Sequence, residues 1–257
     1  MRFTGDYHTH TVNSHGKGTV EDNIYAALNR GLKEIAITDH GLNHMFFPIK
    51  RNKLEKISNE VRLLNKSFND IKIYMGVEAN LISADGEIDI KSHEYRFFDL
   101  ILCGFHKCVF FKGGSYFFKI AAPAFAAKAF KPSSKQIALN TEMYIKAIEN
   151  NPIDIITHLN HDISVDVLKI AETAAKYGTY LEINSKTITF DDKILVNELL
   201  STNVEFIVDS DAHKPSDVGN FQNAEELIAK YEIPLNRIAN SIEGKINFRS
   251  KNNGAGK

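Results

Sequence analysis

Short runs of apolar and β-branched residues recur along the chain, and longer segments with a helical spacing of apolar positions separate them. This alternation is typical of repeated strand–helix units. Ile35-Ala36-Ile37 and Phe206-Ile207-Val208 are apolar at every position, as expected for parallel strands that are buried on both faces. The pattern predicts strands near residues 2–8, 33–38, 71–77, 98–104, 153–157, 179–183 and 204–209.

Helix signals lie between the predicted strands. Residues 20–30 repeat apolar side chains at helical spacing, and Gly31 stands where it can end the helix. Residues 52–66 show the same spacing, and Ser164 is placed to cap a later helix. Strands that each precede a helix or a long loop predict a closed or nearly closed β/α barrel, with a doubly wound open sheet as the alternative.

One segment departs from this alternation of predicted strands and helices. Residues 112–131 combine Gly113-Gly114 and Pro123 with several aromatic side chains and lysines. They are predicted to be an inserted segment that either packs over the barrel rim or closes as a lid over the active site, and a contact with a partner or a membrane surface is a third interpretation. Because no linker divides the chain, residues 1–250 are predicted to form one domain, followed by a frayed tail at 251–257.

Composition narrows the class of protein. Hydrophobic residues make up 43% and charged residues 25% of the 257 residues, as in ordinary globular proteins. The 31 Lys and Arg nearly balance the 32 Asp and Glu, which argues against nucleic acid as a partner. The sequence shows neither a signal peptide nor a membrane-spanning stretch, so we expect a cytoplasmic protein without membrane contact. Cys103 and Cys108 are predicted to be reduced thiols, and a homo-oligomer is compatible with the sequence.

Histidines and carboxylates gather where the predicted strands end. Because the loops after the strands of a β/α barrel converge on one face, we expect these side chains to meet in one cavity. Residues i and i+2 of an extended chain point the same way, which explains the spacing of His-x-His and Asp-x-His. The other histidines, His44, His93 and His161, are predicted to have structural roles, with His161 standing near a candidate ligand. The nine candidate ligands are His8, His10, His15, His40, Glu78, His106, His158, Asp211 and His213.

This set of ligands indicates a metal centre. Imidazoles with a few carboxylates suit zinc, manganese or iron, and zinc is the metal we expect. Nine ligands exceed the need of one ion and suffice for three divalent ions if Glu78 bridges two of them. Such clusters stabilise both oxygens of an in-line displacement at phosphorus, and they supply a hydroxide near neutral pH. The sequence has no Walker-type loop or Gly-x-Ser-x-Gly elbow that would point to another mechanism.

The same residues resemble the PHP (polymerase and histidinol phosphatase) superfamily. The stretch from Ala84 to Asp89 is similar to that of the small stand-alone bacterial phosphatases of this superfamily. The resemblance implies a distorted seven-stranded (β/α)7 TIM-like barrel that holds a trinuclear metal site. The matching motifs follow in the family's order: Asp6-Tyr7-His8-Thr9-His10-Thr11, Ile37-Thr38-Asp39-His40-Gly41, Gly76-Val77-Glu78-Ala79-Asn80, Gly104-Phe105-His106, His158 and Ser210-Asp211-Ala212-His213.

The resemblance also implies how the ligands divide among the ions. Asp6 and Asp39, which stand beside candidate ligands, are predicted to accept hydrogen bonds from the ligand histidines and so orient their rings. The implied sets are His8, His10, Glu78 and Asp211 for the first ion, His15, His40 and His213 for the second, and Glu78, His106 and His158 for the third.

The predicted function is hydrolysis of small phosphomonoesters by a cluster-bound hydroxide, as in histidinol-phosphate phosphatases. Asp211 and His213 are predicted to be catalytic, and Lys107 and Lys214 to neutralise the phosphate oxygens. One alternative is a phosphodiesterase or 3′–5′ exonuclease, with the aromatic side chains of 112–131 stacking on a single strand. An amidohydrolase-type C–N hydrolase and a non-enzymatic metal-binding protein are the others.

Overall fold

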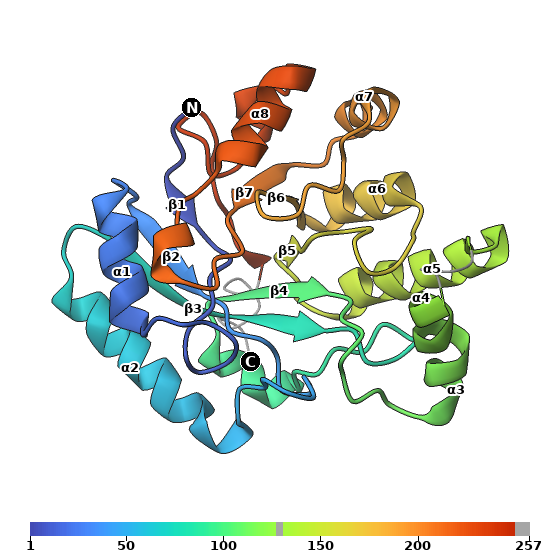
Figure 1. Cartoon of the computed structure of the whole chain (residues 1–257), viewed down its shortest axis with the longest axis horizontal. Helices are drawn as coiled ribbons and strands as arrows, with labels where there is room; N and C mark the ends of the chain where they lie inside the picture. The colour runs from blue at the N-terminus through green and yellow to red at the C-terminus, as the bar shows by residue number, and fades with distance from the viewer. Residues whose placement is uncertain (127–130, 250–257) are drawn as a thin grey trace.

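The structure is a computed structural model that describes residues 1–126 and 131–249. Its seven strands pair in parallel, each with the next in the chain, and they curve into a nearly closed barrel (Figure 1). This confirms the predicted barrel and rules out the doubly wound sheet, in which the strand order is not sequential. The strands are β1 (Gly5–Asp6), β2 (Glu34–Ile37), β3 (Lys72–Asn80), β4 (Leu100–Gly104), β5 (Ile155–Ile156), β6 (Tyr180–Asn184) and β7 (Phe206–Asp209).

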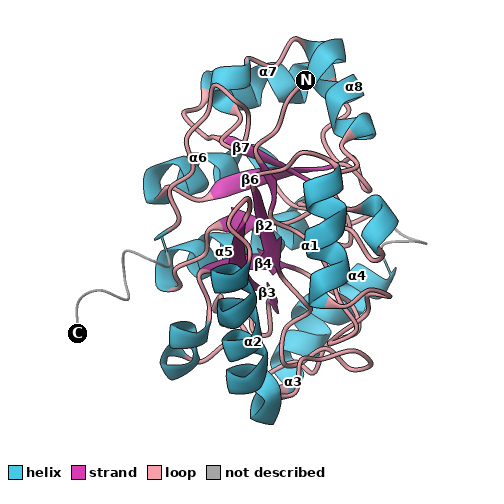
Figure 2. Ribbon diagram, turned by 90° about the vertical axis from the view of Figure 1, so that its left-hand side faces the viewer, coloured by secondary structure: helices cyan, strands magenta, loops and turns pink. Residues whose placement is uncertain are grey.

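Helices surround the strands, which run through the middle of the molecule (Figure 2). Within residues 1–126 and 131–249, no helix has the length and the apolar character that crossing a membrane requires. The α-helices are α1 (Val20–Asn29), α2 (Leu54–Ser67), α3 (Gly114–Tyr116), α4 (Ala122–Ala126), α5 (Ser134–Asn150), α6 (Val167–Tyr177), α7 (Lys193–Ser201) and α8 (Gln222–Tyr231). Shorter helical turns are η1 (Arg51–Lys53), η2 (Ser92–Phe97), the π-helical η3 (Phe117–Ala121), η4 (Pro215–Asp217) and η5 (Leu235–Arg237).

Local capping sets the helix ends. Gly31 follows the end of α1 with a positive φ of 76°, a conformation that favours glycine. The prediction that Ser164 caps the next helix is wrong, because α6 begins after Asp166, whose carboxylate accepts the backbone N–H of Lys169 at 3.3 Å. The carbonyl of Ser164 instead accepts a hydrogen bond from Asn140 of α5 at 2.8 Å.

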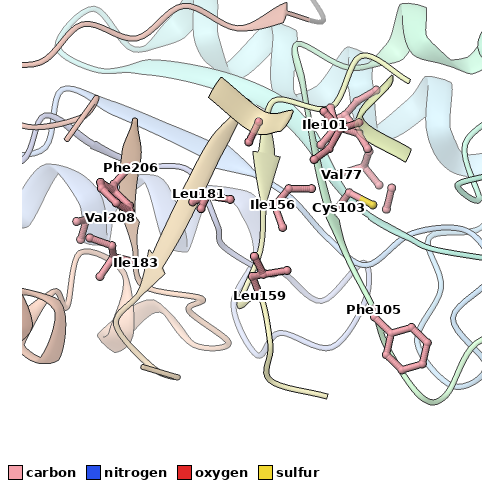
Figure 3. Close-up of a cluster of buried hydrophobic side chains, with 14 of the residues drawn as sticks. Val77, Ile101, Cys103, Phe105, Ile156, Leu159, Leu181, Ile183, Phe206 and Val208 are labelled. Atoms are coloured by element: carbon pink, nitrogen blue, oxygen red, sulfur yellow. The ribbon is translucent and has the colours of Figure 1, made fainter. Parts of the chain in front are cut away.

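Alternation along the strands separates two apolar layers. Ile35 and Ile37 pack in the large core between barrel and helices, whereas Ala36 belongs to a second cluster with Tyr74 and Leu100 on the other face of the sheet. Figure 3 shows part of the large core, where side chains of neighbouring strands meet. Because both faces are buried, the strand runs are continuously apolar rather than alternating.

Loops rather than a strand ladder close the barrel between its first and last strands. Beyond β1 and β7, Thr9 pairs with Ala212 in an isolated parallel bridge. The N–H of His10 donates to the Ala212 carbonyl at 2.8 Å, and the N–H of Ala212 donates to the His8 carbonyl at 3.2 Å. The closure therefore brings the motif around His8 and His10 beside the motif around Asp211.

The segment at 112–131 contains α3, η3 and α4, and its residues 127–130 lie outside the described residues. Tyr116 anchors it, since its hydroxyl donates to the Leu81 carbonyl at 3.3 Å and contacts Met143 Sδ of α5 at 3.3 Å. Phe118 is 74% exposed on the opposite side of the segment. The predicted tail at 251–257 also lies outside the described residues.

Candidate metal centre

The nine candidate ligands come together at the carboxyl ends of the strands, as the barrel predicts. Glu78 lies within β3, and the others lie in the loops that follow β1, β2, β4, β5 and β7. Six of them are buried, namely His8, His10, His40, Glu78, His158 and Asp211. His106 and His213 are partly buried, and His15 is exposed.

Glu78 stands at the centre of the cluster. Its carboxylate is almost completely buried, and the imidazoles of five histidines lie next to it. The nearest nitrogen–oxygen distances are 3.4 Å to His8, 3.6 Å to His10, 2.8 Å to His40, 3.2 Å to His106 and 2.9 Å to His158. A carboxylate in this position can bridge neighbouring ions, the role implied by the family resemblance.

Within residues 1–126 and 131–249, three groups of side chains have ligand atoms close enough to hold an ion. All ligand atoms within each group lie within 4.8 Å of one another. The groups are His8, His10 and Asp211; His10, His40 and His213; and His40, Glu78 and His106. Each group shares at least two residues with one of the implied ligand sets, but His10 and His40 each belong to two groups, and neither His15 nor His158 belongs to any. The two remaining candidate ligands lie next to these groups. His158 Nε2 lies 2.9 Å from Glu78 Oε1, and the centre of the His15 ring lies 4.9 Å from that of His213.

Several buried ligand atoms fit a metal centre because they have no other partner. Within residues 1–126 and 131–249, His8 Nε2, both ring nitrogens of His10 and Glu78 Oε2 make no hydrogen bond. His40 Nδ1 lies 2.8 Å from Glu78 Oε2 without the geometry of a hydrogen bond. A buried polar group without a partner costs about 1–3 kcal/mol, and bound cations would remove this cost. The residues present therefore fit the metal ions that the family implies.

Charges and burial put both carboxylates and His10 in their metal-binding forms, whereas Glu182 and Glu78 outweigh burial and raise the pKa of His8 well above its usual value, so that an ion would displace a proton from His8. Burial alone would raise the pKa of the Glu78 carboxyl, but the imidazoles of His106 and His8 lower it well below its usual value. The pKa of Asp211 is likewise lowered well below its usual value, because His8 and His10 outweigh the effect of burial. Burial lowers the pKa of His10 well below its usual value. Both carboxylates are therefore ionised and His10 is neutral at neutral pH, as metal binding requires.

Polar partners behind the cluster orient its histidine rings. Glu182 Oε1 lies 2.6 Å from His8 Nδ1, and Asn80 Oδ1 lies 2.8 Å from His106 Nδ1. Asp89 in turn accepts a hydrogen bond from the Asn80 amide at 2.7 Å. Partners of this kind fix the tautomer of a metal-binding histidine. They leave the Nε2 atoms of His8 and His106 facing Glu78.

The orienting role predicted for Asp6 and Asp39 is wrong. Asp6 accepts hydrogen bonds from Ser210 Oγ at 2.5 Å and from the Gly219 N–H at 2.8 Å. Asp39 accepts them from the backbone and hydroxyl of Thr11, both at 2.6 Å. The two carboxylates tie loops of the site together instead of contacting rings.

Face-to-face stacking supports two further ligands. The His44 ring stacks on His40 with centres 4.7 Å apart and planes at 16°. Phe47 stacks on His15 at 4.4 Å and 18°. Both supporting rings belong to the loop after β2. His44 therefore contacts a candidate ligand, while His93 is exposed on η2.

A cavity of about 200 Å³ opens onto the cluster. Larger hollows exist elsewhere, among them one of about 740 Å³ beside Arg2 and Phe221, but none of the nine ligands lines it. The cavity connects the cluster with the protein surface. Its lining residues are His40, Glu78, His106, His158, His161, Asp162, Lys186, Thr187, Asp211 and His213.

Neither of the two predicted lysines lines this cavity, although Lys107 pairs with a residue that does. Lys107 Nζ pairs with Asp162 at 2.9 Å, and Lys214 Nζ lies 3.7 Å from Asp217 on the surface. The cavity is lined instead by Lys186, whose Nζ lies 3.5 Å from Asp211 Oδ1. Sequence reasoning missed Lys186, which lies three residues beyond the predicted strand at 179–183.

Glu182 was also missed. The sequence does contain a clue to its role, because Glu182 is the one charged residue in the predicted strand at 179–183. In the structure its side chain has no exposed surface. A fully buried carboxylate needs partners, so its position predicts a role in holding other polar groups.

Comparisons with known proteins agree with this geometry. The family model described as PHP domain matches residues 6–186. A protein from Shewanella sediminis named "Probable phosphatase" is 31% identical over 261 residues, covering 98% of this chain and 95% of that protein. The relative therefore matches nearly the whole chain, whereas the family model ends before the motif around Asp211.

Two solved structures share the fold. Histidinol phosphate phosphatase from Lactococcus lactis, solved with zinc, L-histidinol and phosphate, has a TM-score of 0.56 at 19% identity, covering 89% of this chain and 93% of that one. A putative histidinol phosphatase from Listeria monocytogenes has a TM-score of 0.63 at 16% identity, covering 86% and 99%. The family model matches most of this chain, and the ligand motifs converge on one cluster. This chain therefore belongs to the PHP domain family.

Proposed function

We propose that this protein is a metal-dependent phosphatase that hydrolyses small phosphomonoesters. The observation that carries the proposal is Glu78, buried among five imidazoles at the base of a cavity. The name of the Shewanella sediminis relative, "Probable phosphatase", supports the same reaction class. The proposed domain extends over residues 1–250.

The cluster would hold three divalent ions, with zinc expected and manganese or iron as alternatives. Zinc in the similar fold of the Lactococcus lactis enzyme supports this choice. When bound, the ions supply a Lewis acid for the phosphoryl oxygens and an activated water as nucleophile. The proposed ligands are His8, His10, His15, His40, Glu78, His106, His158, Asp211 and His213.

The chain's own residues would bind and orient the ester. The cavity of about 200 Å³ is smaller than typical ligand pockets, which suits a phosphate group with a short alcohol rather than a nucleic-acid strand. Asp211 and His213 line it and would face the phosphate, and His161 with Asp162 forms another part of the wall. The near balance of charges over the whole chain also disfavours a polynucleotide substrate.

A phosphate-release assay on zinc-loaded protein tests the proposal. The panel contains sugar phosphates, amino-alcohol phosphates, a phosphodiester and single-stranded DNA. We expect release from at least one monoester, loss of it in His10→Ala, and full activity in His93→Ala, which changes an exposed histidine away from the cluster. Turnover of the diester or DNA alone, or unchanged monoester turnover in His10→Ala, would contradict the proposal.

A further inference from the structure

The loop after β6 brings a lysine to the cavity. Lys186 Nζ lies 2.9 Å from His213 Nδ1 and 3.5 Å from Asp211 Oδ1. Its side chain is 49% exposed, so the ammonium group stands between the cluster and solvent. Among the described residues that line the cavity, Lys186 is the one Lys or Arg.

The backbone that carries Lys186 is held by the cluster itself. Asn184 Oδ1 accepts the N–H groups of Lys186 at 3.0 Å and of Thr187 at 2.8 Å. The amide nitrogen of Asn184 donates to Glu182 Oε2 at 3.0 Å and lies 3.4 Å from Asp211 Oδ2. One amide side chain therefore fixes the lysine loop relative to the predicted ligands, which limits the entropy that Lys186 would lose on binding an anion.

The charges around Lys186 indicate an anionic ligand. Asp211 is its nearest carboxylate, and this carboxylate is also a proposed metal ligand. With divalent ions in the cluster, Asp211 would be shared with them, and the ammonium would stand beside further positive charge. A phosphate dianion placed in the cavity would satisfy both the ions and the ammonium.

We propose that Lys186 binds a non-bridging phosphate oxygen of the substrate, an inference that rests on the proposed function. The two other lysines beside the ligands are already paired with carboxylates, since Lys107 lies 2.9 Å from Asp162, a residue of the cavity wall, and Lys214 lies 3.7 Å from Asp217 on the surface. A lysine suits this position because its ammonium is a compact charge on a flexible stem that can follow the phosphate.

The test measures binding of inorganic phosphate to zinc-loaded protein by calorimetry, together with metal content and steady-state kinetics. The variants are Lys186→Met, Lys186→Arg and, as a matched control, Lys169→Met, which removes an exposed lysine of α6. Losing one charged donor should weaken phosphate binding by roughly 10- to 100-fold. The metal content should stay unchanged, Arg should restore part of the binding, and the control should bind as the wild type does.

Three outcomes would overturn the inference. Lys186→Met that binds phosphate as tightly as wild type, while the wild type is active, refutes the role of Lys186 and leaves the proposed function standing. Loss of metal in Lys186→Met would assign the lysine to holding Asp211 instead. Wild-type protein with full metal content that neither binds phosphate nor releases it would refute the proposed function itself.

Discussion

Replacing Glu182 by glutamine removes one buried negative charge and leaves the shape of the side chain nearly unchanged. Glu182 Oε1 contacts His8 Nδ1 at 2.6 Å, while Oε2 accepts the backbone N–H of His158 at 2.6 Å and the amide of Asn184 at 3.0 Å. A glutamine has one oxygen for these donors. Either the His8 ring or the His158 backbone would therefore face an NH₂ group.

The loss can be estimated from these contacts. A hydrogen bond to a buried charged group is worth about 1.5–3 kcal/mol, and removing a carboxylate behind a metal-binding histidine lowers metal affinity by roughly 10- to 100-fold. We therefore expect Glu182→Gln to weaken zinc binding by roughly 30-fold at the group that contains His8. The rate of phosphate release should fall with it when zinc is limiting.

Competition between the protein and a zinc-chelating dye measures this affinity, and thermal unfolding checks that the variant is folded. Glu205→Gln is a matched control because it makes the same change at an exposed glutamate just before β7. Folded Glu182→Gln that binds zinc as tightly as the wild type would refute the orienting role of Glu182.

Further changes test the surroundings of the cluster. Phe47→Ala removes the ring stacked on His15 and should lower zinc bound per chain in elemental analysis, whereas unchanged zinc content would show that stacking is dispensable. Gly104→Ala places a methyl group 2.9 Å from His158 Cε1 and should destabilise the fold by about 1–3 kcal/mol in denaturant unfolding, and an unaltered midpoint would contradict this packing. Cys103 should react with a thiol reagent only in denaturant, because burial raises its pKa well above the usual value, and rapid labelling of the folded protein at this position would disprove its burial.

The pattern of strands could be predicted from sequence because both faces of each strand are buried. Seven apolar runs correspond to the seven observed strands. Strand lengths were less predictable, since β1 and β5 have two residues each where seven and five were expected. Apolar residues next to these strands are buried without belonging to them, as Tyr7 is after β1 and Ile153 is before β5, so burial alone did not mark the strand ends.

The direction of individual side chains explains what the site predictions missed. Lys107 and Lys214 each follow a candidate ligand directly, and neighbours in an extended chain point to opposite sides. Within β6, the same period of two places Glu182 and Asn184 on one side, where Glu182 contacts His8 and Asn184 contacts Asp211. Lys186 lies in the bend after Asn184, the last residue of β6, and the conformation of such a bend could not be predicted from the sequence pattern.

The metal cluster is the central claim, and anomalous diffraction at the zinc edge from crystals of zinc-loaded protein tests it most directly. The account predicts three peaks around Glu78, each about 2.0–2.3 Å from its ligand atoms. The first should lie near Asp211, the second near His213 and the third near His106. A map without peaks among these side chains, or with zinc bound only elsewhere on the protein, would contradict the account.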